Sequence, residues 1–220
     1  MIYKIKVPSI EEISFGVNGR FKSWFNELSR YQVQIFIATI FFLFAGSINY
    51  FSGNFADRGG AVVVPDIVLD HLPVFNMPSM FVYGIFAVMG LILLYPLIFK
   101  VKDFAYAFGQ LSLLIMIRNF SVILTHLGRP DGAITIHFPA IIRYWNFNND
   151  LFFSGHVAIP FLGFFVFKDS KVRWLFLICA IAMAAIVLMA HKHYSIDVLS
   201  AFFIAYGSYK IGEHALKKLK

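Results

Sequence analysis

The chain has 220 residues, of which 59% are hydrophobic and only 14% are charged. A soluble domain of this size is about half apolar and a quarter charged, so the composition excludes an ordinary water-soluble globule and indicates one integral membrane domain. The net charge of +7 does not indicate nucleic-acid binding, because the basic residues flank apolar runs, where they anchor and orient a membrane protein. Cys179 is the only cysteine, which excludes an intrachain disulfide.

The first segment, residues 1–31, is too long and too charged for a signal peptide. Large apolar residues recur at helical spacing from Phe21 to Leu28, with charged residues around them. This pattern predicts an amphipathic helix over residues 19–31 that lies in the cytoplasmic interface of a membrane.

Six apolar runs follow, and a helix that crosses a membrane needs roughly 17–25 such residues. The runs lie at about residues 32–51, 80–99, 104–126, 152–167, 173–190 and 194–212. They predict an all-α membrane protein, a bundle of six transmembrane helices over residues 32–212, with a basic cytoplasmic tail at 213–220.

The basic residues predict the orientation. Fourteen of them fall on the side of the two termini, and the other side has only Arg58, Arg129, Arg143 and Lys192. Because the side rich in Lys and Arg is normally cytoplasmic, we expect both termini inside the cell. Six of the seven histidines then lie on the other face. We call this face extracytoplasmic, a term that covers a periplasmic, extracellular or lumenal side.

The tripeptide Ser154-Gly155-His156 stands where an apolar run begins. The N-terminus of a helix offers unpaired N–H groups and a partial positive charge, both of which attract phosphate. Serine can cap the helix and donate to a phosphate oxygen, and glycine lets a phosphate approach the main chain. Taken alone, the tripeptide favours a plain helix cap with an incidental histidine, and the functional interpretation depends on the other motifs.

His193 and Asp197 are four residues apart at the start of the last run, so they share one helical face. An acid in the first turns of a membrane helix is costly unless it has a partner. The pair therefore suits an activated nucleophile, in which the carboxylate fixes the imidazole tautomer. A surface histidine beside a capping acid is the alternative.

Arg118 lies inside the third run, seven residues or roughly 10 Å before Thr125 on the same face. A guanidinium in an apolar layer faces the interior of the bundle or extends outward, and phosphate is a natural partner for it. An ion pair is the alternative, with Asp150, Asp66 or Asp70 as the acid.

Asp66, Asp70 and His71 form a short polar stretch before the second run. They lack a full metal ligand set, so capping or contact with substrate is favoured over a metal site. The sequence indicates no metal and no cofactor.

With these segments in this order, the chain resembles the sphingomyelin synthase family, within the wider PAP2-like superfamily of lipid phosphatases and phosphotransferases. The resemblance covers roughly residues 32–212. The matching segments are Pro65-Asp66 with Asp70-His71, Arg118 with Thr125, Asp150 through His156, and His193 through Asp197.

The resemblance implies a role for each matching residue. His193 would attack the donor phosphorus and form a phosphohistidine, Asp197 would orient it, and His156 would serve as acid and then as base. The residues expected to contact substrate or phosphate are Arg118, Thr125, Asp150, Ser154, Gly155, Tyr194, Asp66 and Asp70. A signature of the phosphatase branch is absent, because Val122 and Val187 occupy its lysine and arginine positions, and this favours the synthase side.

We therefore expect an enzyme that moves a phospho-headgroup from a glycerophospholipid to a lipid hydroxyl such as ceramide or diacylglycerol. The alternative is a lipid phosphate phosphatase or phospholipase C-like hydrolase, in which water is the acceptor. A non-enzymatic lipid binder or transporter is disfavoured, because the sequence has no paired repeats. The expected partners are membrane lipids, and the sequence leaves room for a homo-oligomer.

Overall fold

The computed structural model describes residues 10–136, 147 and 149–219. The described residues form helices, with one isolated bridge between Val62 and Leu127 and no strand, so the all-α prediction is confirmed. The α-helices are α1 (Ile10–Arg58), α2 (Pro78–Phe99), α3 (Val101–Leu124), α4 (Gly155–Val166), α5 (Val172–Met189) and α6 (Ser195–Ala215). Two 3₁₀ turns, η1 (Leu69–His71) and η3 (Lys217–Leu219), complete the fold.

Four helices of the described chain, α1, α2, α3 and α5, are long and apolar enough to cross a membrane. They fit an integral membrane protein. α4 is equally apolar but has only 12 residues, and α6 carries polar groups such as Asp197 and Lys210 along its 21 residues. The count of six spans therefore stays a prediction, although each predicted run coincides with a helix.

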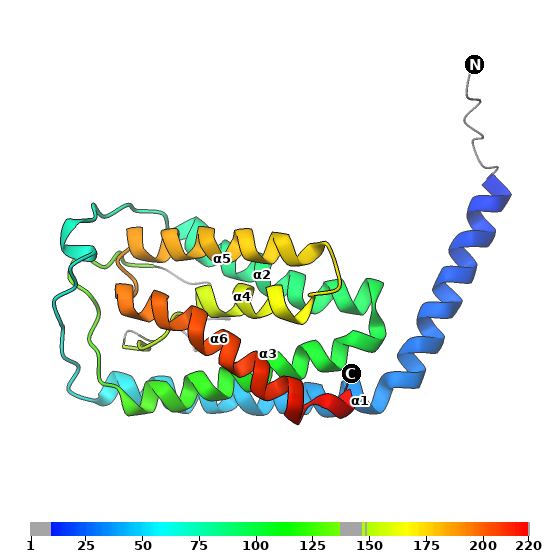
Figure 1. The fold of residues 1–220 in the computed structure, drawn as a ribbon, viewed down its shortest axis with the longest axis horizontal. Coiled ribbons are helices and arrows are strands. Elements are labelled where there is room, and N and C mark those ends of the chain that lie inside the picture. The colour runs from blue at the N-terminus through cyan, green and yellow to red at the C-terminus, as the bar shows by residue number, and fades with distance from the viewer. Residues whose placement is uncertain (1–9, 137–146, 148, 220) are drawn as a thin grey trace, which may run out of the picture.

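α1 is one helix of 49 residues, so the predicted interfacial helix at 19–31 and the first predicted span are not separated by a break. Its N-terminal part diverges from the bundle, as Figure 1 shows in dark blue. Trp24 ties this part to α2, because its indole N–H donates a 2.7 Å hydrogen bond to the carbonyl of Leu97. The interfacial position of residues 19–31 stays a prediction.

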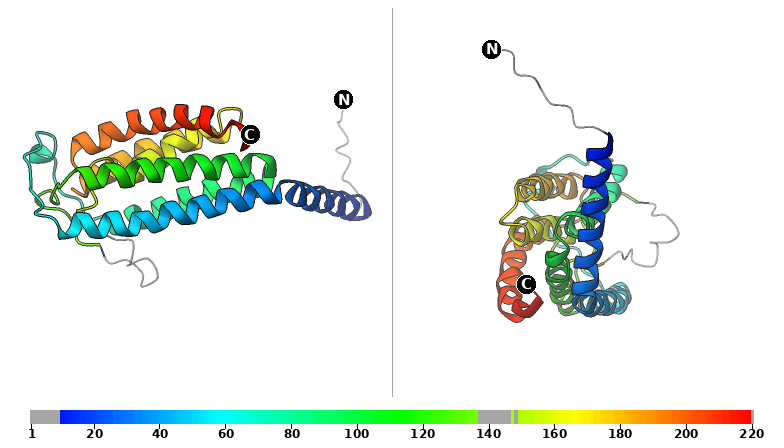
Figure 2. Two further views of the ribbon diagram at one scale, coloured as in Figure 1. Left: turned by 90° about the horizontal axis from the view of Figure 1, so that it is seen from below. Right: turned by 90° about the vertical axis from the view of Figure 1, so that its right-hand side faces the viewer.

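The six helices alternate in direction (Figures 1 and 2). One end of the bundle collects the C-termini of α1, α3 and α5 and the N-termini of α2, α4 and α6. We call this the loop end, because the segments 59–77 and 125–136 also lie there. The C-terminus and the N-terminal part of α1 lie at the opposite end. The motifs found in the sequence are thus brought to a single end of the molecule.

α3 is the central helix and is buried along most of its length. Two polar contacts fix its neighbours: the Asn119 amide donates to the Ala45 carbonyl of α1 at 2.9 Å, and Gln110 donates to the Tyr209 carbonyl of α6 at 3.3 Å. Gly212 leaves room for the Gln110 side chain, since a Cβ there would overlap it. Close helix packing of this kind depends on small residues.

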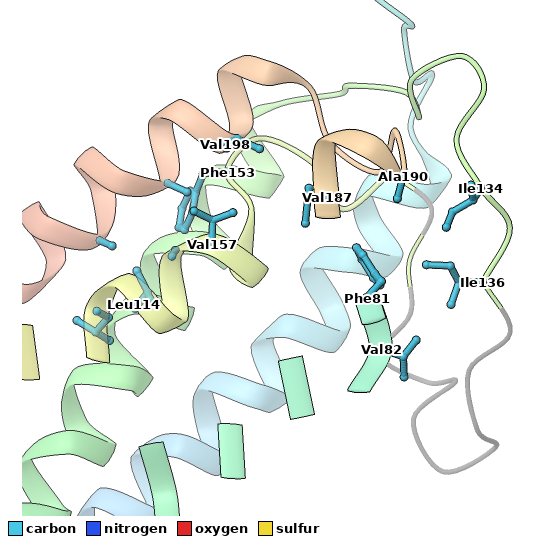
Figure 3. Close-up of a cluster of buried hydrophobic side chains, with 14 of the residues drawn as sticks. Phe81, Val82, Leu114, Ile134, Ile136, Phe153, Val157, Val187, Ala190 and Val198 are labelled. Carbon is cyan, nitrogen blue, oxygen red and sulfur yellow. The ribbon is translucent and has the colours of Figure 1, made fainter. Parts of the chain in front are cut away.

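An apolar cluster lies directly behind the start of α4 and α6 (Figure 3). Phe153 and Val157 of the α4 segment pack there with Val198 of α6, Val187 of α5 and Phe81 of α2, and all five are buried. The polar groups of the loop end therefore lie next to close-packed apolar side chains. This packing limits how far the N-termini of α4 and α6 can shift.

Candidate active site

His193 and Asp197 are in contact, as their spacing predicts. His193 Nδ1 lies 3.1 Å from Asp197 Oδ2, and the same oxygen accepts the Tyr194 N–H at 3.2 Å. The Asp197 side chain is fully buried. A carboxylate in this position keeps the proton on Nδ1 and leaves the lone pair of Nε2 on the opposite side of the ring.

The start of α4 is joined to the start of α6 through the main chain. The Ser154 N–H donates to the Asp197 carbonyl at 3.2 Å. His156 follows two residues later, and its ring packs on Phe81 with 3.9 Å between ring centroids. His193, Arg118 and Lys192 lie near enough to His156 to influence it electrostatically. The starts of α4 and α6 therefore bring the two imidazoles to the same end of the bundle.

Arg118 pairs with Asp150, which resolves the choice among three acids. Its NH1 donates to both carboxylate oxygens of Asp150, at 2.8 and 2.9 Å, and its NH2 donates to the Asp150 carbonyl at 3.0 Å. The guanidinium also lies against α4, because a Cβ at Gly155 would be 3.3 Å from Arg118 Nε. Gly155 thus permits the arginine to approach the N-terminus of the helix.

Among the described residues, eight buried side-chain polar atoms have no hydrogen-bond partner, and four of these eight lie at this site. They are Arg118 Nε, Ser154 Oγ, His156 Nε2 and Asp197 Oδ1. The first two are donors, and the third becomes one when its nitrogen carries the proton. An unsatisfied buried donor costs about 1–3 kcal/mol, and phosphate oxygens are strong acceptors for such groups. The arrangement therefore fits a phosphate group.

Asp66 reaches this site from the loop 59–77 but uses its carboxylate within the protein. Oδ2 accepts the Ser195 N–H at 2.6 Å, and Oδ1 accepts the N–H groups of Val68 and Leu69 at 2.9 and 3.2 Å. Burial raises the pKa of Asp66, but these hydrogen bonds outweigh it and hold the pKa below its usual value. Asp66 therefore anchors the loop to the N-terminus of α6, and its contact with substrate stays a prediction.

Thr125 and Tyr194 are likewise engaged with the main chain. The Thr125 hydroxyl is placed to donate to the carbonyls of Ser121 and Leu151, at 3.2 and 3.3 Å. The buried Tyr194 hydroxyl donates to the Gly128 carbonyl at 2.9 Å and accepts a bond from the Val64 N–H at 3.2 Å. Both side chains hold the loop end together, and their predicted contacts with substrate remain untested.

Asp70 is exposed beside this region, on the rim of a pocket of about 790 Å³. Asp66, Asp131, His191 and Tyr194 also line the pocket. Asp66, Asp70 and His71 do not form a metal site, because the His71 ring is hydrogen-bonded to the Ile67 carbonyl. Within the described ranges no group of three ligating side chains is placed to hold a metal ion.

Sequence reasoning missed two parts of the site. Phe81 is one of 27 phenylalanines, and nothing in the pattern distinguishes the one that packs on His156. The contact between Asp66 and Ser195, 129 residues apart, also had no local signal.

Comparison with known proteins finds similarity over part of the chain. Residues 149–215 match the family described as PAP2 superfamily C-terminal. The phosphatidylcholine:ceramide cholinephosphotransferase 2 proteins of Rattus norvegicus and Mus musculus are each 36% identical to the chain over 61 residues, and that of Homo sapiens is 39% identical over 61. The aligned segment is 25% of this chain and 17% of each relative.

The part of the chain that matches contains Asp150, His156, His193 and Asp197, whereas Asp66 and Arg118 precede it. This supports a role within the lipid phosphotransferase and phosphatase superfamily. The chain thus has a PAP2 superfamily C-terminal region, and the resemblance to sphingomyelin synthases is confirmed for it.

Proposed function

We propose that the protein is a membrane lipid phosphotransferase that moves a phospho-headgroup from a glycerophospholipid to a lipid hydroxyl, through a phosphohistidine at His193. The observation that carries the proposal is the gathering of two imidazoles, a buried carboxylate and unpartnered donors at one end of the bundle. Nucleophilic catalysis by histidine requires such a set: a nucleophile, a group that orients it, and an acid–base partner.

In the first step, the lone pair of His193 Nε2 forms a bond to the donor phosphorus. The bond between phosphorus and the glycerol oxygen breaks, and the departing oxygen takes a proton from the His156 imidazolium, whose charged form the bound phosphate anion stabilises. Asp197 stabilises the positive charge that develops on His193, because it is hydrogen-bonded to Nδ1. Diacylglycerol leaves, and the headgroup phosphate remains on His193.

In the second step, His156, now neutral, removes the proton from the acceptor hydroxyl. The acceptor oxygen bonds to phosphorus and the bond to His193 Nε2 breaks, which restores the nucleophile. Arg118 and the N–H groups at the start of α4 supply positive charge to the phosphate oxygens throughout. One histidine thus acts as acid and then as base, as a two-step transfer requires.

A hydrolase is the second candidate, since the same residues would pass the headgroup to water. The names of the similar relatives favour ceramide as the acceptor. The membrane orientation that we propose puts the loop end on the extracytoplasmic face, because four lysines lie at the opposite end: Lys100, Lys168 and Lys171 between helices, and Lys102 in the first turn of α3. Both termini are then cytoplasmic.

The test is a product assay on the purified full chain in lipid nanodiscs. Mixed glycerophospholipids, ceramide and diacylglycerol are supplied in ¹⁸O-labelled water, and all products are identified by mass spectrometry. A phosphosphingolipid without ¹⁸O supports transfer, whereas a free phospho-headgroup or free phosphate with ¹⁸O supports the hydrolase. His193→Ala should abolish every product, and His156→Ala should be inactive as well.

Two results would overturn the proposal. Turnover that survives His193→Ala would exclude a phosphohistidine intermediate at His193. Wild-type protein that consumes no lipid phosphate ester under any of these conditions removes the enzymatic function.

A further inference from the structure

The segment of residues 149–154 leads into α4 and is held at both ends. At its start, the Asn149 N–H donates to Asp57 Oδ1, near the end of α1, at 2.8 Å. At its end, the Ser154 N–H donates to the Asp197 carbonyl at 3.2 Å. Between these anchors, Phe152 has a φ of 141°, which residues other than glycine rarely adopt. Such strain persists only where surrounding contacts hold it, so the path of this segment is fixed.

The fixed segment places Asp150 against Arg118 of α3. Arg118 NH1 donates to both carboxylate oxygens of Asp150, at 2.8 and 2.9 Å, and NH2 donates to the main-chain carbonyl of the same residue at 3.0 Å. Because these three hydrogen bonds engage both terminal nitrogens, they determine the direction in which the guanidinium points as well as its position. A lysine could form the ion pair but could not be oriented in this way.

This orientation leaves Arg118 Nε at the start of α4. A Cβ at Gly155 would lie 3.3 Å from Nε, and the Nε atom is buried without a hydrogen-bond partner in the described part of the chain. Ser154, which is fully buried and precedes Gly155, has an unpartnered Oγ as well. Two buried donors without partners at the N-terminus of a helix are costly unless an anion accepts hydrogen bonds from them.

We propose that Asp150 is a positioning residue, which turns Arg118 so that its Nε–H binds a non-bridging oxygen of a phosphate group at the start of α4. This inference rests on the proposed function, because the phosphate is that of the lipid substrate. Asp150 then acts on the phosphate only through Arg118, whereas the resemblance implied a direct contact. If Asp150 instead competed with phosphate for the guanidinium, its removal would strengthen phosphate binding.

The test measures the affinity of the purified full chain for inorganic phosphate by ³¹P NMR, in a maltoside detergent that contains no phosphorus. Asp150→Asn should weaken phosphate binding about tenfold or more, because an amide holds the guanidinium less firmly than a carboxylate does. Arg118→Met should weaken binding at least as much. Adding Asp150→Asn to Arg118→Met should then cause no further loss, since the residue through which Asp150 acts is already absent.

Arg118→Lys tests the orientation separately from the charge. The lysine ammonium can still pair with Asp150, so this variant should fold, but it has no second donor held toward α4. We therefore expect it to bind phosphate about as weakly as Arg118→Met. Asp169→Asn, at an exposed acid of the opposite end, is the matched control and should bind phosphate as the wild type does. Thermal unfolding of every sample sets a temperature at which all variants are folded.

Three results would overturn the role of Asp150. The first is phosphate binding by Asp150→Asn that equals or exceeds that of the wild type. The second is an equal loss of affinity from Asp150→Asn with and without Arg118, because the acid would then act independently. The third is wild-type binding by Arg118→Lys, which also decides the question if Asp150→Asn does not fold.

These outcomes are distinct from a failure of the proposed function. The phosphate affinities need no turnover, so they report on Asp150 and Arg118 even where no lipid is consumed. Activity that survives His193→Ala would overturn the proposed function and leave the affinities unchanged. In nanodiscs, kcat/KM of Asp150→Asn for the lipid donor should fall about tenfold or more, in step with its phosphate affinity.

Discussion

The main-chain N–H of Ser154 donates a 3.2 Å hydrogen bond to the carbonyl of Asp197, so the N-termini of α4 and α6 are tied together through the backbone. Both partners are buried. His156 follows one of them and His193 is hydrogen-bonded to the other. This bond and the apolar cluster behind the two helix starts together limit the spacing of the two imidazoles.

Gly155→Ala should lower activity without unfolding the protein. The new methyl group would lie 3.3 Å from Arg118 Nε, which forces the guanidinium to move by a few tenths of an ångström. Because small displacements of a charge-stabilising group are costly to catalysis, we expect kcat/KM to fall roughly tenfold. Gly207→Ala on α6 is the control, since a Cβ there meets no atom within 4 Å. Equal activity in the two variants would contradict the placement of Arg118.

Asp197→Asn should reduce the rate by about 100-fold or more, because the amide cannot hold the proton on His193 Nδ1 as a carboxylate does. The fold should persist, since the Asn oxygen can still accept the Tyr194 N–H. Steady-state rates and thermal unfolding in detergent separate the two effects. Asp169→Asn, the same change at an exposed acid of the opposite end, should alter neither. Loss of folding in Asp197→Asn would show that the acid is structural.

Arg118 and Asp150 should be energetically coupled. Both side chains are largely buried, with 13% and 18% exposure, and Arg118 NH1 contacts both carboxylate oxygens while NH2 contacts the Asp150 carbonyl. Removing either partner leaves the other charge unpaired, so each single variant, Arg118→Met and Asp150→Asn, should lose about 1–3 kcal/mol of unfolding free energy. A double-mutant cycle measured by thermal unfolding should give a coupling of about 1 kcal/mol or more. If the losses of unfolding free energy in the two single variants simply add in the double variant, the ion pair does not contribute to stability.

Asp66→Asn should destabilise the protein at neutral pH and have little effect in acid. The pKa of Asp66 is held below its usual value of 3.8, so the ionised group stabilises the folded state above about pH 4, and this contribution is lost as pH falls through the folded-state pKa. The expected loss at pH 7 is about 1–3 kcal/mol, because three N–H groups donate to the carboxylate. Unfolding midpoints at pH 7 and pH 3 provide the comparison. An equal loss at both pH values would contradict the assignment.

The helices and the local part of the site could be predicted from the sequence, because both depend on short-range spacing. Long apolar runs give helix positions, and a four-residue interval brings His193 onto Asp197. Arg118 could be said to need an anion, but which of three acids it meets depends on the path of the loop that carries Asp150. Position along the sequence does not contain that information.

The remaining contacts depend on packing between distant segments. Asp66 reaches Ser195 across 129 residues, and the stacking of Phe81 on His156 depends on how α2 lies against α4. The continuity of α1 through residues 31 and 32 was also not predicted, because a change in composition does not require a break in a helix. The two hydrogen bonds of the Tyr194 hydroxyl, which join two loops, likewise had no local signal in the sequence.

The shortness of α4 has a consequence for how a lipid arrives. With 12 residues it is about 18 Å long, against about 30 Å for the hydrocarbon layer of a bilayer. Its first residues lie level with Asp197, one turn into α6, and Figure 1 shows it starting further inward than its neighbours. In the proposed membrane orientation, a phosphate bound at the start of α4 would lie deeper than the loops of this end, and a lipid donor would reach it from the leaflet with its acyl chains in place.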